Sequence, residues 1–241
     1  MIRGLFYLKV EKRNALTAIG ILILVLTLIS IIDGVVIAFY TITFHLSPEM
    51  ALVASTKPII ILNEIIFLLA AFVVTFQIFK WEKKDLGLIR EKLAPNILVG
   101  FGVGVGGYFA ATVFMYLVGL FIPIDVPPWF IEMFRTKDLF DLSFLLLITW
   151  VFIGPCEEIF FRGFIQESLT RWLGSKNGVF AGAIIFGLAH FDPVLWYRTI
   201  AGFLLGVIYG LVYAQRRNLF PVIVAHSLND SIAFILTYLI Q

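Results

Sequence analysis

The chain is short of the residues that mark secreted and soluble proteins. Cys156 is its single cysteine, so an internal disulfide framework is excluded. Charged residues make up 14% of the chain, whereas a soluble domain has roughly a quarter. The basic residues form no tract of the kind that binds nucleic acid, and we expect no nucleic-acid partner. This composition indicates a chain that is embedded in the lipid bilayer.

Long apolar stretches support that conclusion, since 61% of the residues are hydrophobic. A helix needs about 20 apolar residues to cross the ~30 Å core of a bilayer. Seven stretches have this character: 15–40, 58–79, 96–122, 142–161, 178–196, 199–215 and 219–240. The first continues apolar to Phe44 and has room for an eighth helix, and Asp192 and Pro193 interrupt the join between the fifth and the sixth. We predict an all-α fold, a polytopic transmembrane helical bundle of seven spans, or eight, with residues 1–241 forming a single integral membrane domain.

Lysine and arginine are unequally distributed between the loops. Fourteen of the 18 lie in the N-terminal segment and in alternate loops, and four lie in the others: Lys57, Arg135, Lys137 and Arg198. Because cytoplasmic loops carry the excess of basic residues, this asymmetry predicts a multi-pass protein of the cell (plasma) membrane with a cytoplasmic N-terminus and, for seven spans, an external C-terminus.

Glycines cluster in the third and sixth stretches: Gly100, Gly102, Gly104, Gly106 and Gly107 in the third, and Gly202, Gly206 and Gly210 in the sixth. The third stretch superficially resembles a phosphate-binding loop, but such a loop follows a strand and opens a soluble helix. Small residues four apart let membrane helices approach closely. We therefore predict that these glycines serve helix packing.

Two adjacent glutamates interrupt the fourth stretch. A charge at the centre of a membrane helix costs about 2.5–3.5 kcal/mol on insertion scales, so such residues commonly mark function. Glu158 and Arg162 are four apart and share a helix face, which predicts a structural ion pair. Glu157 points about 100° away and has no partner in its own helix. We predict that Glu157 is the reactive carboxylate.

Two further stretches carry histidine. His190 follows Phe186 by one turn, and Phe186 is placed to fix the imidazole by packing; His226 precedes Asp230 by one turn. For either histidine alone, an interhelical hydrogen bond is the simpler interpretation. His45 falls in an outer loop, outside the predicted site.

Asp33 and Glu64 lie toward the outer ends of the first two stretches. We expect them to face the interface or the loops rather than to be catalytic, because charges near span ends find water.

The motifs Glu157-Glu158-x-x-x-Arg162, Phe186-x-x-x-His190 and His226-x-x-x-Asp230, in this order, resemble the CPBP family. That family holds the type II CAAX prenyl endopeptidases and bacteriocin-processing and immunity proteins. The resemblance places the catalytic core at about 142–240, and the segment 86–90 is similar to a further family feature.

The resemblance implies a hydrolase, an intramembrane endopeptidase. Glu157 would activate the attacking water with help from His190, and His226 with Asp230 would stabilise the oxyanion. Many members have Asn at position 230; an ionised aspartate cannot donate a hydrogen bond, so Asp230 must be protonated or act by orienting His226. Asn229 points about 100° away and is an imperfect substitute.

We expect no required cofactor as the first choice, although the family that the chain resembles was long described as metallopeptidases. Zn²⁺ is the alternative, with Glu157, His190 and His226 as its ligands. We favour metal-independent chemistry because the spacing is unlike His-Glu-x-x-His.

Several functions stay open at this stage. The first is CAAX-type C-terminal processing of a peptide or prenylated-protein substrate; the second is bacteriocin processing or self-immunity. A non-proteolytic membrane transporter or scaffold is the alternative outside hydrolysis, since buried Glu and His chains also serve transport. The sequence does not define the oligomeric state.

Overall fold

The computed structural model describes residues 2–240 and the side chains of residues 8–240. This part of the chain contains helices and turns and no strand, which confirms the all-α class. The elements are α1 (Ile2–Phe44), α2 (Pro48–Phe72), η1 (Val73–Ile78), η2 (Lys83–Leu86), α3 (Leu93–Gly119), α4 (Pro128–Phe134), α5 (Leu139–Ile148), η3 (Thr149–Ile153), α6 (Gly154–Glu158), η4 (Ile159–Gln166), α7 (Glu167–Leu173), α8 (Ser175–Ala189), α9 (Trp196–Arg216) and α10 (Phe220–Leu239). Here η2 is a 3₁₀-helix, and η1, η3 and η4 are π-helical.

Within the described residues, 6 helical segments are long and apolar enough to cross a bilayer, as expected of a multi-pass membrane protein. The predicted count of seven or eight is not confirmed. The fifth predicted stretch forms α8, which has only 15 residues. No eighth helix hides in the first stretch, because α1 runs unbroken for 43 residues.

The early end of α8 has a local cause in the sequence. Proline disfavours helical backbone at the residue before it, so Pro193 prevents the helix from continuing through Asp192. The Asp192 carboxylate then accepts hydrogen bonds from the backbone N–H groups of Val194 and Leu195, at 2.7 and 2.9 Å. A short turn therefore separates α8 from α9.

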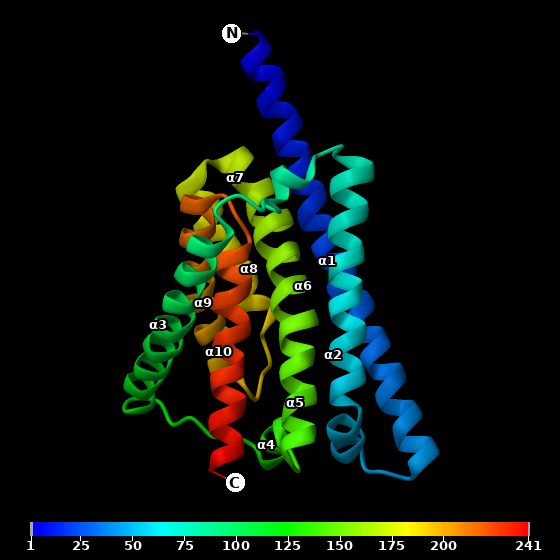
Figure 1. Cartoon of the computed structure of the whole chain (residues 1–241). Coiled ribbons are helices and arrows are strands. Elements are labelled where there is room, and N and C mark those ends of the chain that lie inside the picture. Colours follow the sequence, from blue (N-terminus) through cyan, green and yellow to red (C-terminus); the bar gives the residue numbers. More distant parts are fainter. Residues whose placement is uncertain (1, 241) are drawn as a thin grey trace.

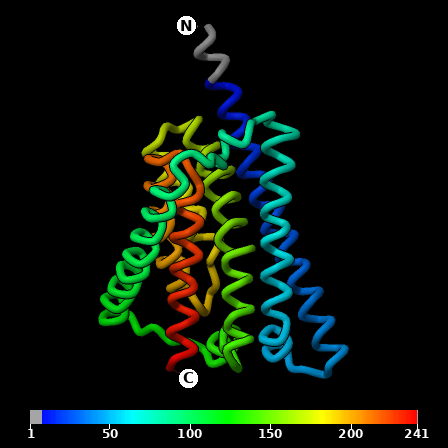
Figure 2. The backbone as a smooth tube through the Cα atoms, viewed as in Figure 1, coloured from blue at the N-terminus to red at the C-terminus, as the bar shows by residue number. Residues whose placement is uncertain are grey.

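The helices form one bundle (Figure 1). The column of α5 and α6 stands between α2 and α10 and packs against both. The N-terminal part of α1 and the end of α10 lie at opposite ends of the bundle, as Figure 1 shows and as the coloured part of the backbone trace in Figure 2 also shows. This arrangement agrees with the prediction that the termini lie on opposite sides; which side is cytoplasmic stays a prediction.

The central helix is longer than the sequence predicted. It runs from Leu139 to Leu173, through α5, η3, α6, η4 and α7, whereas the predicted stretch ended at residue 161. The extension carries the polar residues Arg162, Gln166 and Glu167, all at most 1% exposed. Each of them has a polar partner on another residue of the protein, as buried polar groups require. The Glu157–Glu158 pair consequently lies in the middle of this helix rather than near its end.

Buried polar contacts explain how the extension is accommodated. Gln166 donates a hydrogen bond to the Gly210 carbonyl at 3.0 Å. Glu167 accepts from Arg171 at 2.8 Å and from Arg217 at 2.6 and 2.7 Å.

The segment 86–90 docks on the junction between α9 and α10. The Leu86 side chain is fully buried, and the Gly87 carbonyl accepts a hydrogen bond from the backbone N–H of Leu219 at 2.9 Å. Next to it, Asp85 accepts a hydrogen bond from Arg171 at 2.8 Å. Partial burial opposes ionisation of Asp85, but the bonds from Arg171 and from the Glu82 backbone outweigh it and lower the pKa of this carboxyl.

The packing prediction for the glycines is confirmed on one face of α3 and wrong on the other. A Cβ at Gly100 would lie 2.7 Å from the Pro221 carbonyl oxygen, and one at Gly104 would lie 2.8 Å from that of Ala225. These two glycines therefore allow α3 to approach α10 closely. A Cβ at Gly102 or Gly106 would meet nothing within 4 Å.

This division predicts opposite effects of alanine on the two faces of α3. Gly104→Ala should lower the free energy of unfolding by about 1–3 kcal/mol, because the methyl group overpacks against α10 backbone. Gly106→Ala should be neutral or stabilising by up to about 1 kcal/mol, from helix propensity alone. Thermal unfolding in detergent measures both; equal melting temperatures for the two variants would contradict the packing.

Candidate active site

A cavity of about 600 Å³ brings together the residues that the sequence analysis selected. Its lining includes four predicted catalytic residues and the predicted packing residue: Glu157, His190, His226, Asp230 and Phe186. They come from α6, the end of α8, and α10. Residues separated by more than 70 positions therefore meet at one place in the bundle.

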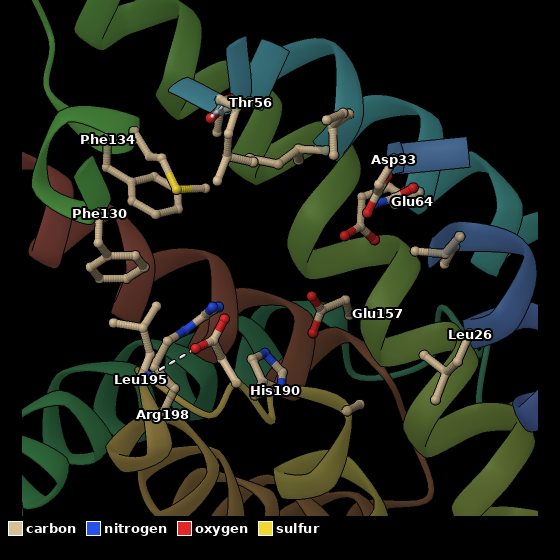
Figure 3. Close-up of a pocket in the computed structure, with 18 of the residues that line it drawn as sticks. Leu26, Asp33, Thr56, Glu64, Phe130, Phe134, Glu157, His190, Leu195 and Arg198 are labelled. Atoms are coloured by element: carbon tan, nitrogen blue, oxygen red, sulfur yellow. Dashed lines mark hydrogen bonds between the residues drawn. The ribbon is translucent and has the colours of Figure 1, made fainter. Parts of the chain in front are cut away.

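A second cavity of about 410 Å³ adjoins the first and extends toward α1 and α2. Both cavities are lined by Glu157 and His190. Figure 3 shows these two side chains entering the second cavity from different helices. The carboxylate and the imidazole are thus accessible from two connected spaces, both lined largely by apolar side chains.

The predicted Glu158–Arg162 ion pair is present and buried. Glu158 Oε1 lies 3.0 Å from Arg162 Nη1, and the two side chains are 0% and 2% exposed. The Arg162 guanidinium also lies over the Phe186 ring, with Cζ 3.9 Å from the ring centroid. Phe186 contacts His190 as predicted, with the ring centroids 4.7 Å apart.

Glu158 has a second partner that the sequence analysis did not anticipate. His226 Nδ1 lies 2.7 Å from Glu158 Oε1, so the ring donates this hydrogen bond to the carboxylate. One oxygen therefore holds both Arg162 and His226. Glu158 acts as a positioning residue for the histidine as well as a partner of the arginine.

The other nitrogen of His226 faces the cavity. Nε2 lies 3.6 Å from Asp230 Oδ2 and 4.0 Å from Glu157 Oε2, both longer than a hydrogen bond. The Tyr209 ring packs beside the imidazole at 5.7 Å between centroids. Nε2 thus faces the cavity between two carboxylates.

His190 has a defined tautomer. Its Nδ1 lies 2.8 Å from the Phe186 carbonyl oxygen, which can only accept, so Nδ1 carries the hydrogen. In the neutral ring Nε2 then holds a lone pair. This nitrogen is able to accept a hydrogen bond from water in the cavity.

Asp230 and its neighbour Asn229 face different sides of α10. Asp230 lines the larger cavity, and its side chain is 26% exposed. Asn229 is 7% exposed and lies on the side of α10 that faces Gly107 of α3. Asn229 does not reach the cavity, so only Asp230 is placed to act there, through His226.

Glu64 was wrongly placed by the sequence analysis. It is 5% exposed and lines both cavities, and its Oε2 has no hydrogen-bond partner among the described residues. The reason is the helix boundary: α2 begins at Pro48, ten residues before the predicted start, which moves Glu64 from the end of the span toward its middle. Asp33 lines the smaller cavity and accepts a hydrogen bond from Asn63 at 3.3 Å.

Arg198 was also missed, having been assigned to an outer loop. It lies in the first turn of α9 and lines both cavities. The sequence signal that pointed to it was the Asp192-Pro193 interruption, which turns the chain back before α9.

Metal-independent chemistry stays a prediction, and the candidate ligands Glu157, His190 and His226 do not form a ready-made site for a metal ion. Among the residues described, no three His, Cys, Asp or Glu side chains converge closely enough to hold one. His226 Nδ1 is taken by Glu158, which leaves Nε2 as the nitrogen of this ring that faces the cavity, 4.0 Å from Glu157 Oε2.

The shared oxygen of Glu158 predicts different consequences for the two glutamates. Glu158→Gln leaves a buried arginine without its counter-charge and should destabilise the protein by about 3–5 kcal/mol. Glu157→Gln removes no ion pair within 3.5 Å and should leave the melting temperature in detergent within a few degrees of wild type. Equal loss of stability in the two variants would contradict the prediction that Glu158, and not Glu157, stabilises the fold through a buried ion pair.

Residues 139–232 match the family model described as type II CAAX prenyl endopeptidase Rce1-like. No curated protein and no solved structure matches the chain. The matched segment contains Glu157, His190, His226 and Asp230, so it coincides with the geometric site. Residues 139–232 are thus similar to the Rce1-like family of membrane proteases, and this match supports the CPBP resemblance predicted from the motifs.

Proposed function

We propose that the protein is an intramembrane endopeptidase in which Glu157 activates water for attack on a peptide bond. The observation that carries the proposal is the convergence of Glu157, His190, His226 and Asp230 on one cavity inside a membrane bundle. Hydrolysis needs a base, a donor for the oxyanion and a space for the substrate. The cavity contains candidates for each.

The first step is the attack of water. Glu157 takes one proton of a water molecule while the oxygen bonds to the carbonyl carbon of the substrate. His190 accepts the second hydrogen of that water in a hydrogen bond through the lone pair of Nε2. The carbonyl π bond breaks, and its electron pair becomes the oxyanion of a tetrahedral intermediate.

The second step is the release of the amine. His226 in its doubly protonated form donates through Nδ1 to Glu158 and through Nε2 to the oxyanion. The C–N bond breaks as the oxyanion collapses, and protonated Glu157 returns its proton to the leaving nitrogen. Asp230, 3.6 Å from Nε2, orients the imidazole rather than donating to the oxyanion.

The shape of the site favours an apolar, C-terminal substrate. The larger cavity continues along apolar side chains of α10 and α4, including Phe234, Ala233 and Phe130. Phe134 of α4 stacks on Phe234 with ring centroids 5.4 Å apart, and both side chains line the larger cavity. CAAX-type processing of a peptide or prenylated protein, with the lipid tail lying between helices, is the activity that fits best.

Purified protein in detergent should cleave a CAAX-type peptide, and Glu157→Gln should reduce kcat by about 10²–10⁴-fold through loss of the base. His190→Ala should cause a smaller but clear loss. Glu132→Gln removes an exposed carboxylate of α4 and provides the matched control, with wild-type activity. Product analysis by mass spectrometry gives the rates. If Glu157→Gln and His190→Ala are as stable as wild type and cleave as fast, the assignment of the active site is wrong.

Chelators provide a separate test of the metal-independent mechanism. Treatment with EDTA or 1,10-phenanthroline should leave the cleavage rate unchanged, because no step uses a metal. The rate is measured before treatment, after removal of the chelator, and after addition of Zn²⁺. Complete loss that Zn²⁺ restores would contradict the proposed mechanism.

A further inference from the structure

Arg198 differs from the other arginines in residues 8–240. Three of these arginines have side chains that are not exposed: Arg162, Arg171 and Arg198. Arg162 pairs with Glu158 at 3.0 Å, and Arg171 pairs with Asp85 and Glu167 at 2.8 Å each. No described carboxylate lies within 4.0 Å of the Arg198 guanidinium. Arg198 alone lies within the bundle with its charge unmatched.

The surroundings of Arg198 explain why it stays unpaired. Asp192, the nearest acidic residue in sequence, directs Oδ1 to two backbone N–H groups of the turn before α9. The guanidinium instead lies over the Phe130 ring of α4, with Cζ 5.4 Å from the centroid. Figure 3 shows the side chain extending from α9 into the cavity that Glu157 and His190 also enter.

An unpaired guanidinium in an apolar cavity selects a particular ligand. Arginine presents a planar fork of donors that matches a carboxylate, and such charge-assisted bonds are stronger than neutral ones. The rest of the larger cavity is lined mainly by apolar groups, among them Ile131, Leu205 and Phe234. The complementary ligand is an apolar peptide segment with one carboxylate at its end.

We propose that Arg198 binds the C-terminal carboxylate of the peptide substrate. The inference rests on the proposed function and adds a rule for substrate choice. Arg198 and Glu157 line the same cavity of about 600 Å³, a volume typical of sites for small ligands. The carboxylate and the scissile bond therefore lie within a few residues of each other, and the enzyme selects chains that end shortly after the cleaved bond.

The test compares two peptides of identical sequence, one with a free C-terminal carboxylate and one with a C-terminal amide. Wild type should cleave the acid with a kcat/KM about 10- to 100-fold above that of the amide, mainly through KM, as expected for one charge-assisted contact. Arg198→Gln should cleave both peptides at the rate of the amide. Arg135→Gln removes a surface charge paired with Glu132 and should keep the full preference.

Binding to an inactive enzyme separates this inference from the proposed function. Fluorescent versions of the two peptides are titrated onto Glu157→Gln and onto Glu157→Gln/Arg198→Gln. The first variant should bind the acid at least 10-fold more tightly than the amide, and the second should bind them equally. Equal binding of the acid and the amide by Glu157→Gln overturns the role of Arg198. In the cleavage assay, an equal loss of activity on both peptides in Arg198→Gln overturns it as well. Failure of wild type to cut either peptide rejects the endopeptidase function, and the binding ratio still decides whether Arg198 binds a carboxylate.

Discussion

A guanidinium buried at the centre of a membrane bundle is the constraint on which the rest of the site depends. Arg162 is 1% exposed, and a buried charge without a partner costs several kcal/mol. Glu158, one helical turn earlier, supplies the counter-charge through Oε1, and the same oxygen accepts a hydrogen bond from His226. The carboxylate of Glu158 therefore neutralises an arginine of its own helix and connects this helix to α10.

The contact of Glu158 with Arg162 and His226 gives the two adjacent glutamates different roles. Because Glu158 is turned into the protein, Glu157 must point about 100° away, and that direction is the cavity. The same bond orients His226, so that Nε2 faces Glu157 and Asp230. The π-helical turns η3 and η4 flank these residues on both sides, and such turns often occur at functional sites. The local irregularity of the helix and the polar network thus occur at the same place.

The short helix α8 contributes the second half of the site. Its 15 residues span ~22 Å at 1.5 Å per residue, less than the ~30 Å bilayer core. Its end therefore places His190 inside the bundle and lets α9 begin with Arg198 beside the cavity. Irregular backbone within a membrane protein is tolerated where it is buried or lines a cavity; His190, Asp192 and Leu195 of this turn line the smaller cavity, whereas Phe191 and Val194 are exposed.

The lengths of the apolar stretches were sufficient to predict the all-α class, and helical spacing was sufficient to predict the Glu158–Arg162 pair. The group of residues that meet at the cavity was selected as ionisable residues inside apolar stretches and by the motif resemblance. The contact of Glu158 with His226 was not predictable, because it spans 68 positions and leaves no periodic signal. Glu64 and Arg198 were misplaced for a different reason. Their depth depends on where α2 and α9 begin, and helix boundaries are set by proline, capping and tertiary packing that composition does not reveal.

The coupling between Glu158 and Arg162 tests the account most directly. A double-mutant cycle in detergent compares the free energies of unfolding of wild type, Glu158→Gln, Arg162→Met and the double variant. Because each single change strands a buried polar partner, the double variant should be more stable than the sum of the two losses implies, with a coupling of about 0.5–3 kcal/mol. Strictly additive losses would contradict the claim that this buried pair organises the site.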